Sequence, residues 1–111
     1  MSKELTMTSC EARVLVEIVP EDHPYQIGGA YLIRTVTNYF TGRVLRVTRQ
    51  EIVIGDAAWI ADTRRFGTAL AQGFSPDAEI EPYPDGSEVI VGRGALVDAS
   101  PWRHALPRVQ Q

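Results

Sequence analysis

The sequence predicts a mainly β protein, a small antiparallel barrel with one short inserted helix. Short runs of β-branched and aromatic residues recur along the chain, which is typical of strands. Gly, Pro and Asp turns separate these runs and are too short for parallel crossovers. One later stretch has helical spacing instead. At 111 residues the chain fits a single domain, 1–111.

The first expected strand is 11–20, which alternates toward its end, is rich in Val and Ile, and stops at Pro20. A polar leader, 1–10, precedes it. Residues 21–24 read as a turn, and 28–29 is a Gly-Gly hinge or tight loop.

Three β-rich runs follow, at 31–39, 43–49 and 52–60. Thr41-Gly42 and Gln50-Glu51 supply two-residue turns between them, which favours an antiparallel meander.

The third run contains a further turn signal, Gly55-Asp56, before the short apolar strand 57–61. Trp59 lies within that apolar strand and is expected in the core.

The only helix that the pattern supports is 63–72, with Asp62 as its cap. Phe66 and Leu70 lie four positions apart on one face, and Gly73 is placed to end the helix.

The last part of the chain predicts short strands again. The expected elements are an edge strand at 80–83, a turn at 84–86, strands at 89–91 and 95–97 around Gly92-Arg93-Gly94, a helical turn from Ser100 through His104, and a polar tail at 108–111. Short strands with one small helix suit a strongly bent barrel, for which an SH3-like or Sm-like architecture fits best.

Composition limits the classes of function. The net charge is −3 and the pI is about 5.3, well below the basic footprint of a nucleic-acid-binding domain. No apolar run approaches the roughly 20 residues that span a bilayer, and 1–10 lacks the apolar block of a signal peptide. We therefore expect no membrane partner and a location in the cytoplasm.

Catalysis and cofactor binding lack support in the sequence. A single cysteine excludes a cysteine-cluster zinc site, and the two histidines, His23 and His104, have no ligand-like spacing. A Cys10–His104 or Ser100–His104 pair has no local motif behind it. We expect a protein that is not an enzyme and uses no metal or cofactor.

Arginine is the strongest polar feature, since ten of the eleven basic residues are Arg. Between 34 and 65 basic residues exceed acids by three, whereas both flanks are acidic, which favours intramolecular pairing. Because side chains alternate along a strand, 43–49 would carry arginine on both of its faces. A strand that is long, bent or covered by another subunit would explain this pattern. The candidate ligand or interface arginines are Arg34, Arg43, Arg46, Arg49 and Arg93, of which Arg43, Arg46 and Arg49 are expected to pair with Glu79, Glu81 or Glu88.

Three further features mark possible contact sites. Glycines on both sides of Arg93 could bring backbone N–H groups to an anion, although a tight turn explains them equally. Trp102, in a proline-bounded turn, is expected to be an interface anchor. His104 completes the candidate set as a surface or interface ring.

Several stretches resemble small bacteriophage- and prophage-encoded proteins of unassigned function with a small SH3- or Sm-like β-barrel. The resemblance covers about two thirds of the chain and is carried by 31–35, 41–44, 56–62, 90–99 and 104–107. It implies a mobile-element origin, and hence a location in the cytoplasm of a host cell or within a virion. It supplies no activity and no functional residues.

Two hypotheses follow. The first is a non-catalytic structural or assembly protein of a phage particle, which forms a homo-oligomer and contacts other phage structural proteins. The second is an accessory anti-defence protein that holds a small anionic, nucleotide-like ligand at a subunit interface. A nucleic-acid-binding module, using arginine and aromatic residues, is a weaker third alternative.

Overall fold

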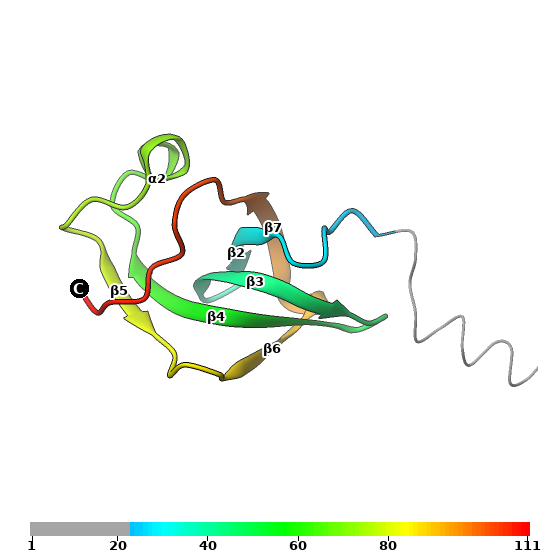
Figure 1. The fold of residues 1–111 in the computed structure, drawn as a ribbon. Coiled ribbons are helices and arrows are strands. Elements are labelled where there is room, and N and C mark those ends of the chain that lie inside the picture. The colour runs from blue at the N-terminus through cyan, green and yellow to red at the C-terminus, as the bar shows by residue number, and fades with distance from the viewer. Residues whose placement is uncertain (1–22) are drawn as a thin grey trace, which may run out of the picture.

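The computed structural model describes residues 23–111, and the strand expected at 11–20 lies outside them. The described part contains six strands, one α-helix and one 3₁₀ turn (Figure 1). In chain order these are β2 (Ala30–Thr35), β3 (Tyr39–Val47), β4 (Glu51–Asp62), α2 (Phe66–Gln72), β5 (Glu79–Pro82), β6 (Glu88–Gly92), η1 (Arg93–Ala95) and β7 (Leu96–Pro101). The mainly β prediction with a single short helix is confirmed.

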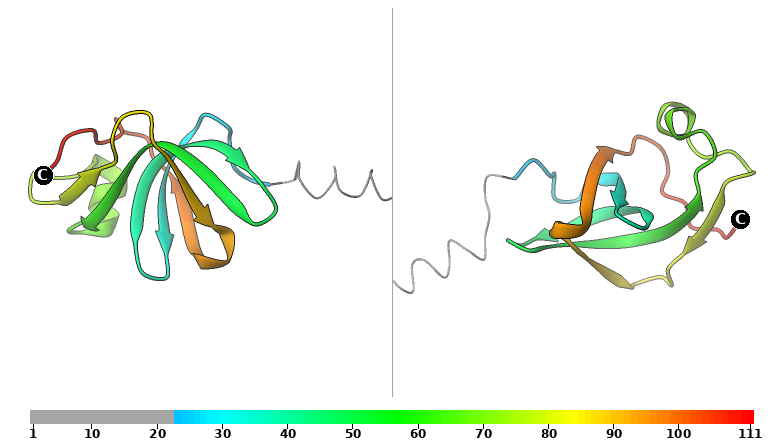
Figure 2. Two further views of the ribbon diagram at one scale, coloured as in Figure 1. Left: turned by 90° about the horizontal axis from the view of Figure 1, so that it is seen from below. Right: turned by 180° about the vertical axis from the view of Figure 1, so that it is seen from behind.

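All strand pairs belong to one antiparallel sheet, ordered β5-β4-β3-β2-β7. β6 also pairs with β4, beside the half that β5 leaves free, so the long β4 carries two partners along one side. The sheet curls strongly (Figure 2). Within the described residues β6 and β7 do not pair, so the sheet bends as a barrel does without closing into one.

The first hairpin turns earlier than its sequence indicates. β2 ends at Thr35 and β3 already begins at Tyr39, so the expected strand 31–39 is two strands. Thr35 closes the turn, because its Oγ1 accepts from the N–H of Asn38 at 2.9 Å. Thr41-Gly42, expected as a turn, lies inside β3, where both residues are buried.

Two β-bulges adjust the β3–β4 pair. Leu45 is an extra residue of β3 between the pairs Val44↔Ile54 and Arg46↔Val53. Val44 and Val47 therefore both face inward while Arg46 faces out, so the bulge bends the strand.

The second bulge is in β4, where Asp56 has a positive φ of 48°. Gly55-Asp56 is thus a bulge inside a continuous strand and does not end it, as the sequence had indicated.

The helix starts three residues later than expected. Its N-cap is Arg65, which makes no side-chain capping hydrogen bond. Asp62 instead holds the turn before the helix, since its Oδ1 accepts from the N–H of Arg64 at 2.7 Å. Gly73 ends the helix as predicted, with φ 89° and its N–H donating to Ala69 O.

The sheet buries both of its faces. The concave face packs a cluster around Ile33, Val44 and Ile54, and the other face packs one around Leu32, Ile60 and Trp102. Helix α2 and the segment after β7 cover this second cluster (Figure 1). Neighbouring residues of β2 therefore belong to different cores, which explains its continuous apolar run.

The chain after β7 is extended, and the helical turn expected from Ser100 to His104 is absent. Ser100 and Pro101 belong to β7, and the Trp102 N–H donates to Ala30 O at 2.8 Å. This segment runs back over the sheet toward β5. The expected polar tail 108–111 is docked there rather than free, with Gln111 exchanging backbone hydrogen bonds with Ile80.

Candidate functional site

The predicted arginines do not gather into one site. Arg34 on β2 forms an ion pair with Asp98 of β7, with Nε to Oδ1 at 2.8 Å, and its guanidinium lies 5.0 Å from the Phe66 ring. This hydrogen bonding lowers the pKa of the Asp98 carboxyl and raises that of Arg34. Arg34 therefore joins β2, β7 and α2 rather than reaching for a ligand.

Arg43 and Arg46 form weak contacts on the outside of β3. Arg46 pairs with Glu88 at 3.4 Å, as the sequence predicted for one of the three acids. Arg43 donates to Gly28 O at 2.7 Å and lies 3.9 Å from Asp56, which was not among the expected partners. These exposed pairs are each worth less than about 1 kcal/mol. Arg49, in the β3–β4 turn, forms no ion pair with a residue of the described range.

Arg93 binds backbone carbonyls of the protein itself. Its Nη1 donates to Thr48 O at 2.7 Å and its backbone N–H to Gln50 O at 2.7 Å. These bonds tie η1 to the β3–β4 turn. The glycine-flanked arginine is thus a tight turn whose guanidinium is already occupied by backbone carbonyls, and not an open anion cradle.

Trp102 lies in the second core cluster, and His104 contacts helix α2, which covers that cluster. Trp102 is 5% exposed and stacks on Phe74 with ring centroids 4.6 Å apart, so the expected interface role of its side chain is incorrect. His104 Nε2 lies 2.9 Å from Leu70 O, which fastens the C-terminal segment to α2. The burial of Trp102 and the partial burial of His104 follow from the extended path of the chain after β7, where the sequence analysis expected a surface turn.

An aromatic groove is the feature that the sequence analysis missed. Trp59 is 41% exposed, although it was predicted to be core. It lines a hollow of about 380 Å³ whose other walls are Asn38, Phe40, Glu81, Pro82, Tyr83 and Pro84. Phe40 and Tyr83 have ring centroids 6.5 Å apart, so three aromatic side chains share one shallow surface.

Pairing in the sheet builds this groove. Trp59 is opposite Phe40 of β3 on one side and opposite Glu81 of β5 on the other. After β5 the chain is held close, because the Tyr83 N–H donates to Ala57 O at 2.8 Å. The available signal was Tyr83 in a proline-bounded segment, 82–84, since aromatic-lined grooves are common peptide-binding surfaces.

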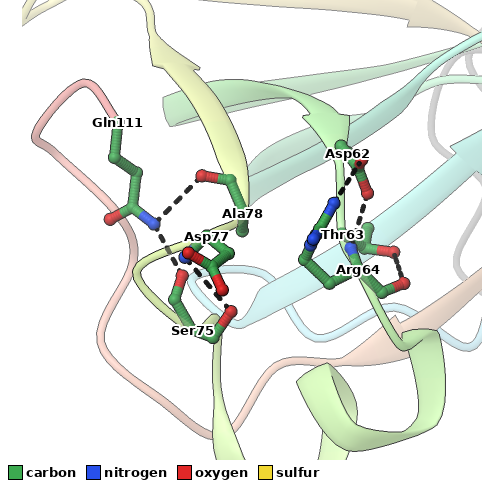
Figure 3. A network of polar contacts seen from close by, with 7 residues as sticks. All are labelled: Asp62, Thr63, Arg64, Ser75, Asp77, Ala78 and Gln111. Carbon is green, nitrogen blue, oxygen red and sulfur yellow. Dashed lines mark hydrogen bonds and ion pairs between the residues drawn. The ribbon is translucent and has the colours of Figure 1, made fainter.

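A smaller polar hollow of about 270 Å³ lies beside α2. It is lined by Thr63, Arg64, Arg65, Thr68, Ala69, Gln72, Gly73, Phe74 and Ser75. Arg64, with φ 59°, is held by Asp62, and Gln111 Nε2 donates to the carbonyls of Ser75 and Ala78 (Figure 3). Two arginines and several hydroxyl groups make this hollow more suited to an anion than the Arg93 turn.

Within 23–111 no three His, Cys, Asp or Glu residues cluster as metal ligands would. No helix among these residues is long and apolar enough to cross a membrane.

Comparison with known proteins leaves the family open. No family model, curated protein or solved structure matches this chain.

Proposed function

We propose that the protein is a non-catalytic assembly protein, of the kind used in a phage particle, that works as a homo-oligomer and docks partner proteins in its aromatic groove. The observation that carries this proposal is the exposure of Trp59 in a groove that Phe40 and Tyr83 also line. Exposed aromatic residues are enriched at protein interfaces, where they provide most of the binding energy.

The groove favours an extended, proline-containing segment as its occupant. Because such a segment has no internal hydrogen bonds, its carbonyls are available to accept from side chains of the groove. Its prolines stack on the aromatic rings. Trp59 supplies an indole N–H, Tyr83 a hydroxyl and Asn38 an amide at the groove.

Negative charge at the groove favours a basic partner segment. Glu81 lines it and is held by Gln110, whose Nε2 donates to Glu81 Oε2 at 2.9 Å. A second acid, Glu79, lies in the same edge strand. A segment with Lys or Arg beside its proline therefore complements the surface.

Intrinsic fluorescence tests the groove directly, because Trp59 is exposed and Trp102 is buried. Titration with basic, proline-containing peptides should shift the Trp59 emission. Trp59→Ala should weaken peptide binding, measured by peptide anisotropy, at least tenfold. The matched control is Val109→Ala, which removes an exposed apolar side chain outside the groove and should leave binding unchanged. Equal binding by both variants would contradict the proposal.

The polar hollow supports a second candidate function, capture of a small phosphate-bearing ligand. Arg64 and Arg65 line it together with the hydroxyls of Thr63, Thr68 and Ser75. Arginine with nearby hydroxyl groups is well suited to phosphate. Calorimetric titration with a cyclic dinucleotide should show binding that Arg65→Ala abolishes and Arg103→Ala preserves. No heat with the parent protein would eliminate this alternative.

A further inference from the structure

The edges of the sheet are protected unequally. The outer edge of β5 is covered by the C-terminus, because Ile80 donates to Gln111 O at 2.8 Å and Gln111 donates back to Ile80 O at 3.0 Å. A covered edge has no free backbone groups with which another chain could pair. This edge is therefore closed to assembly.

The outer edge of β7 carries residues that discourage pairing. The strand contains Asp98, already engaged by Arg34, and ends at Pro101, which has no N–H. The carbonyl of Ala95, just before it, accepts from the N–H of Val36 at 2.9 Å. Charge and proline on an edge strand are the usual protections against strand addition.

The edge of β6 has little such protection. Its sequence, Glu-Val-Ile-Val-Gly, contains one charged residue and neither Lys nor Pro. Ile90 at its centre is 65% exposed, while Val91 is buried in the concave core. β6 runs along the margin of the molecule, and the chain turns away from it at η1 (Figure 1). An apolar edge of this kind invites another strand.

The register shows which backbone groups of β6 have no partner among residues 23–111. The N–H of Arg93 donates to Gln50 O and extends the β4–β6 ladder by one residue. Because antiparallel ladders use alternate residues, Val89 and Val91 face β4. The N–H and C=O of Ile90 therefore point away from the sheet, as do those of Glu88 and Gly92.

We infer that β6 pairs antiparallel with β6 of a second copy, about a two-fold axis at Ile90. This inference rests on the homo-oligomer of the proposed function and names its contact surface. The pairing is self-complementary: Ile90 is opposite the second copy's Ile90, and Glu88 is opposite the second copy's Gly92. No like charges face each other, and Glu88 keeps its own partner Arg46. The two sheets become one continuous sheet across the dimer.

A proline substitution separates this dimer from the fold. Ile90→Pro removes an N–H that β6 does not use with β4, so the monomer keeps its ladder while the edge is blocked. Sedimentation equilibrium of the full chain should show a dimer for the parent and at least a hundredfold weaker association for Ile90→Pro. The matched control Ile90→Thr keeps both the N–H and β propensity and should weaken association less than tenfold. Circular dichroism checks the fold of each variant.

Further variants keep the test decisive. If Ile90→Pro does not fold, Ile90→Lys places two like charges opposite each other and should likewise give monomers. A parent chain that stays monomeric at high micromolar concentration would overturn the inference. So would a dimer that survives Ile90→Pro and is lost in Val16→Asp, which would assign the contact to the N-terminal segment. Peptide binding by Ile90→Pro tests the Trp59 groove independently of the dimer, so failure of the β6 pairing does not imply failure of the groove. A monomeric parent chain would also contradict the proposed homo-oligomer.

Discussion

Thr41 lies in the middle of β3, fully buried between Leu32 of β2 and Ala58 of β4. Its hydroxyl has no hydrogen-bond partner among the described residues. A buried, unpaired hydroxyl costs about 1–3 kcal/mol, whereas a methyl group of the same size would gain from burial. Function does not explain this hydroxyl, since neither hollow reaches it.

Thr41→Val is therefore expected to raise the free energy of unfolding by about 1–3 kcal/mol, because it removes only the unpaired hydroxyl. Urea unfolding followed by circular dichroism measures the change. Thr35→Val is the matched control, since the Thr35 hydroxyl bonds both the N–H and the carbonyl of Asn38. That control should lose about 1 kcal/mol. A loss for Thr41→Val as well would mean that Thr41 has a partner.

The Arg34–Asp98 pair gives the protein a pH dependence in acid. The pKa of Asp98 is lowered in the folded protein, mainly by its hydrogen bonds with Arg34. A carboxyl with a depressed folded pKa stabilises the protein above its unfolded pKa, near 4, and that stability is lost as the pH falls through the folded pKa. Asp98→Asn should thus be less stable than the parent near pH 7, and the difference should shrink as the pH falls below about 4. Urea midpoints across this range measure it, and a constant difference would contradict the assignment.

At the scale of single elements, the bulges of β3 and β4 depend on glycines that let the strands approach. A Cβ on Gly42 would lie 2.9 Å from Ile54 Cδ1 and 3.3 Å from Gly55 O. A Cβ on Gly55 would lie 3.0 Å from Leu45 Cδ1. Gly42 therefore permits close packing inside a strand, and its role is not to turn the chain.

Gly42→Ala is expected to destabilise the protein by about 1–3 kcal/mol, because the core around Ile54 must shift to accept one methyl group. Thermal unfolding measures the loss. Gly94→Ala is the control, since nothing lies within 4 Å of its added Cβ, and should change stability by less than about 0.5 kcal/mol. Comparable losses for the two variants would argue against tight packing at Gly42.

The sequence predicts strand composition well and strand boundaries poorly, for a physical reason. Gly55-Asp56 signals a left-handed residue, and Asp56 does have φ 48°, but a bulge satisfies that signal without a turn. Likewise Trp59 is surrounded in the sequence by Ala57, Ala58 and Ile60, which are buried, yet its own side chain is exposed at that end of β4. Which face is covered depends on where β5, β6 and the C-terminal segment lie, and these contacts are distant in sequence.

For the whole molecule, the C-terminal segment completes the fold. Starting from Trp102 it covers the second core cluster, and through Gln111 it closes the edge of β5. A polar C-terminal segment is easily predicted to be a free tail, because its charged and amide side chains show no hydrophobic pattern that would indicate packing. What holds this one is a set of hydrogen bonds to backbone carbonyls, which no local sequence pattern indicates.

Arg108 binds the sheet and the loop after β5 through its guanidinium. Its Nη1 donates to Ala57 O and its Nη2 to Tyr83 O, each at 3.0 Å, and Nη2 also pairs with Asp85 at 2.7 Å. Arg108→Ala leaves the carbonyl of buried Ala57 without this donor and should cost about 1–3 kcal/mol of unfolding free energy, with a lower Tm. Because the same contacts hold Tyr83 beside Trp59, the variant should also bind groove peptides more weakly.

Arg103→Ala is the control for both effects. It removes a nearby arginine whose side chain forms no ion pair with another described residue, and it should change neither stability nor peptide binding. Hydrogen exchange then locates the effect: faster exchange at Ile80 and Tyr83 in Arg108→Ala supports a docked C-terminus, whereas unchanged exchange there would mean that the segment does not hold the β5 edge.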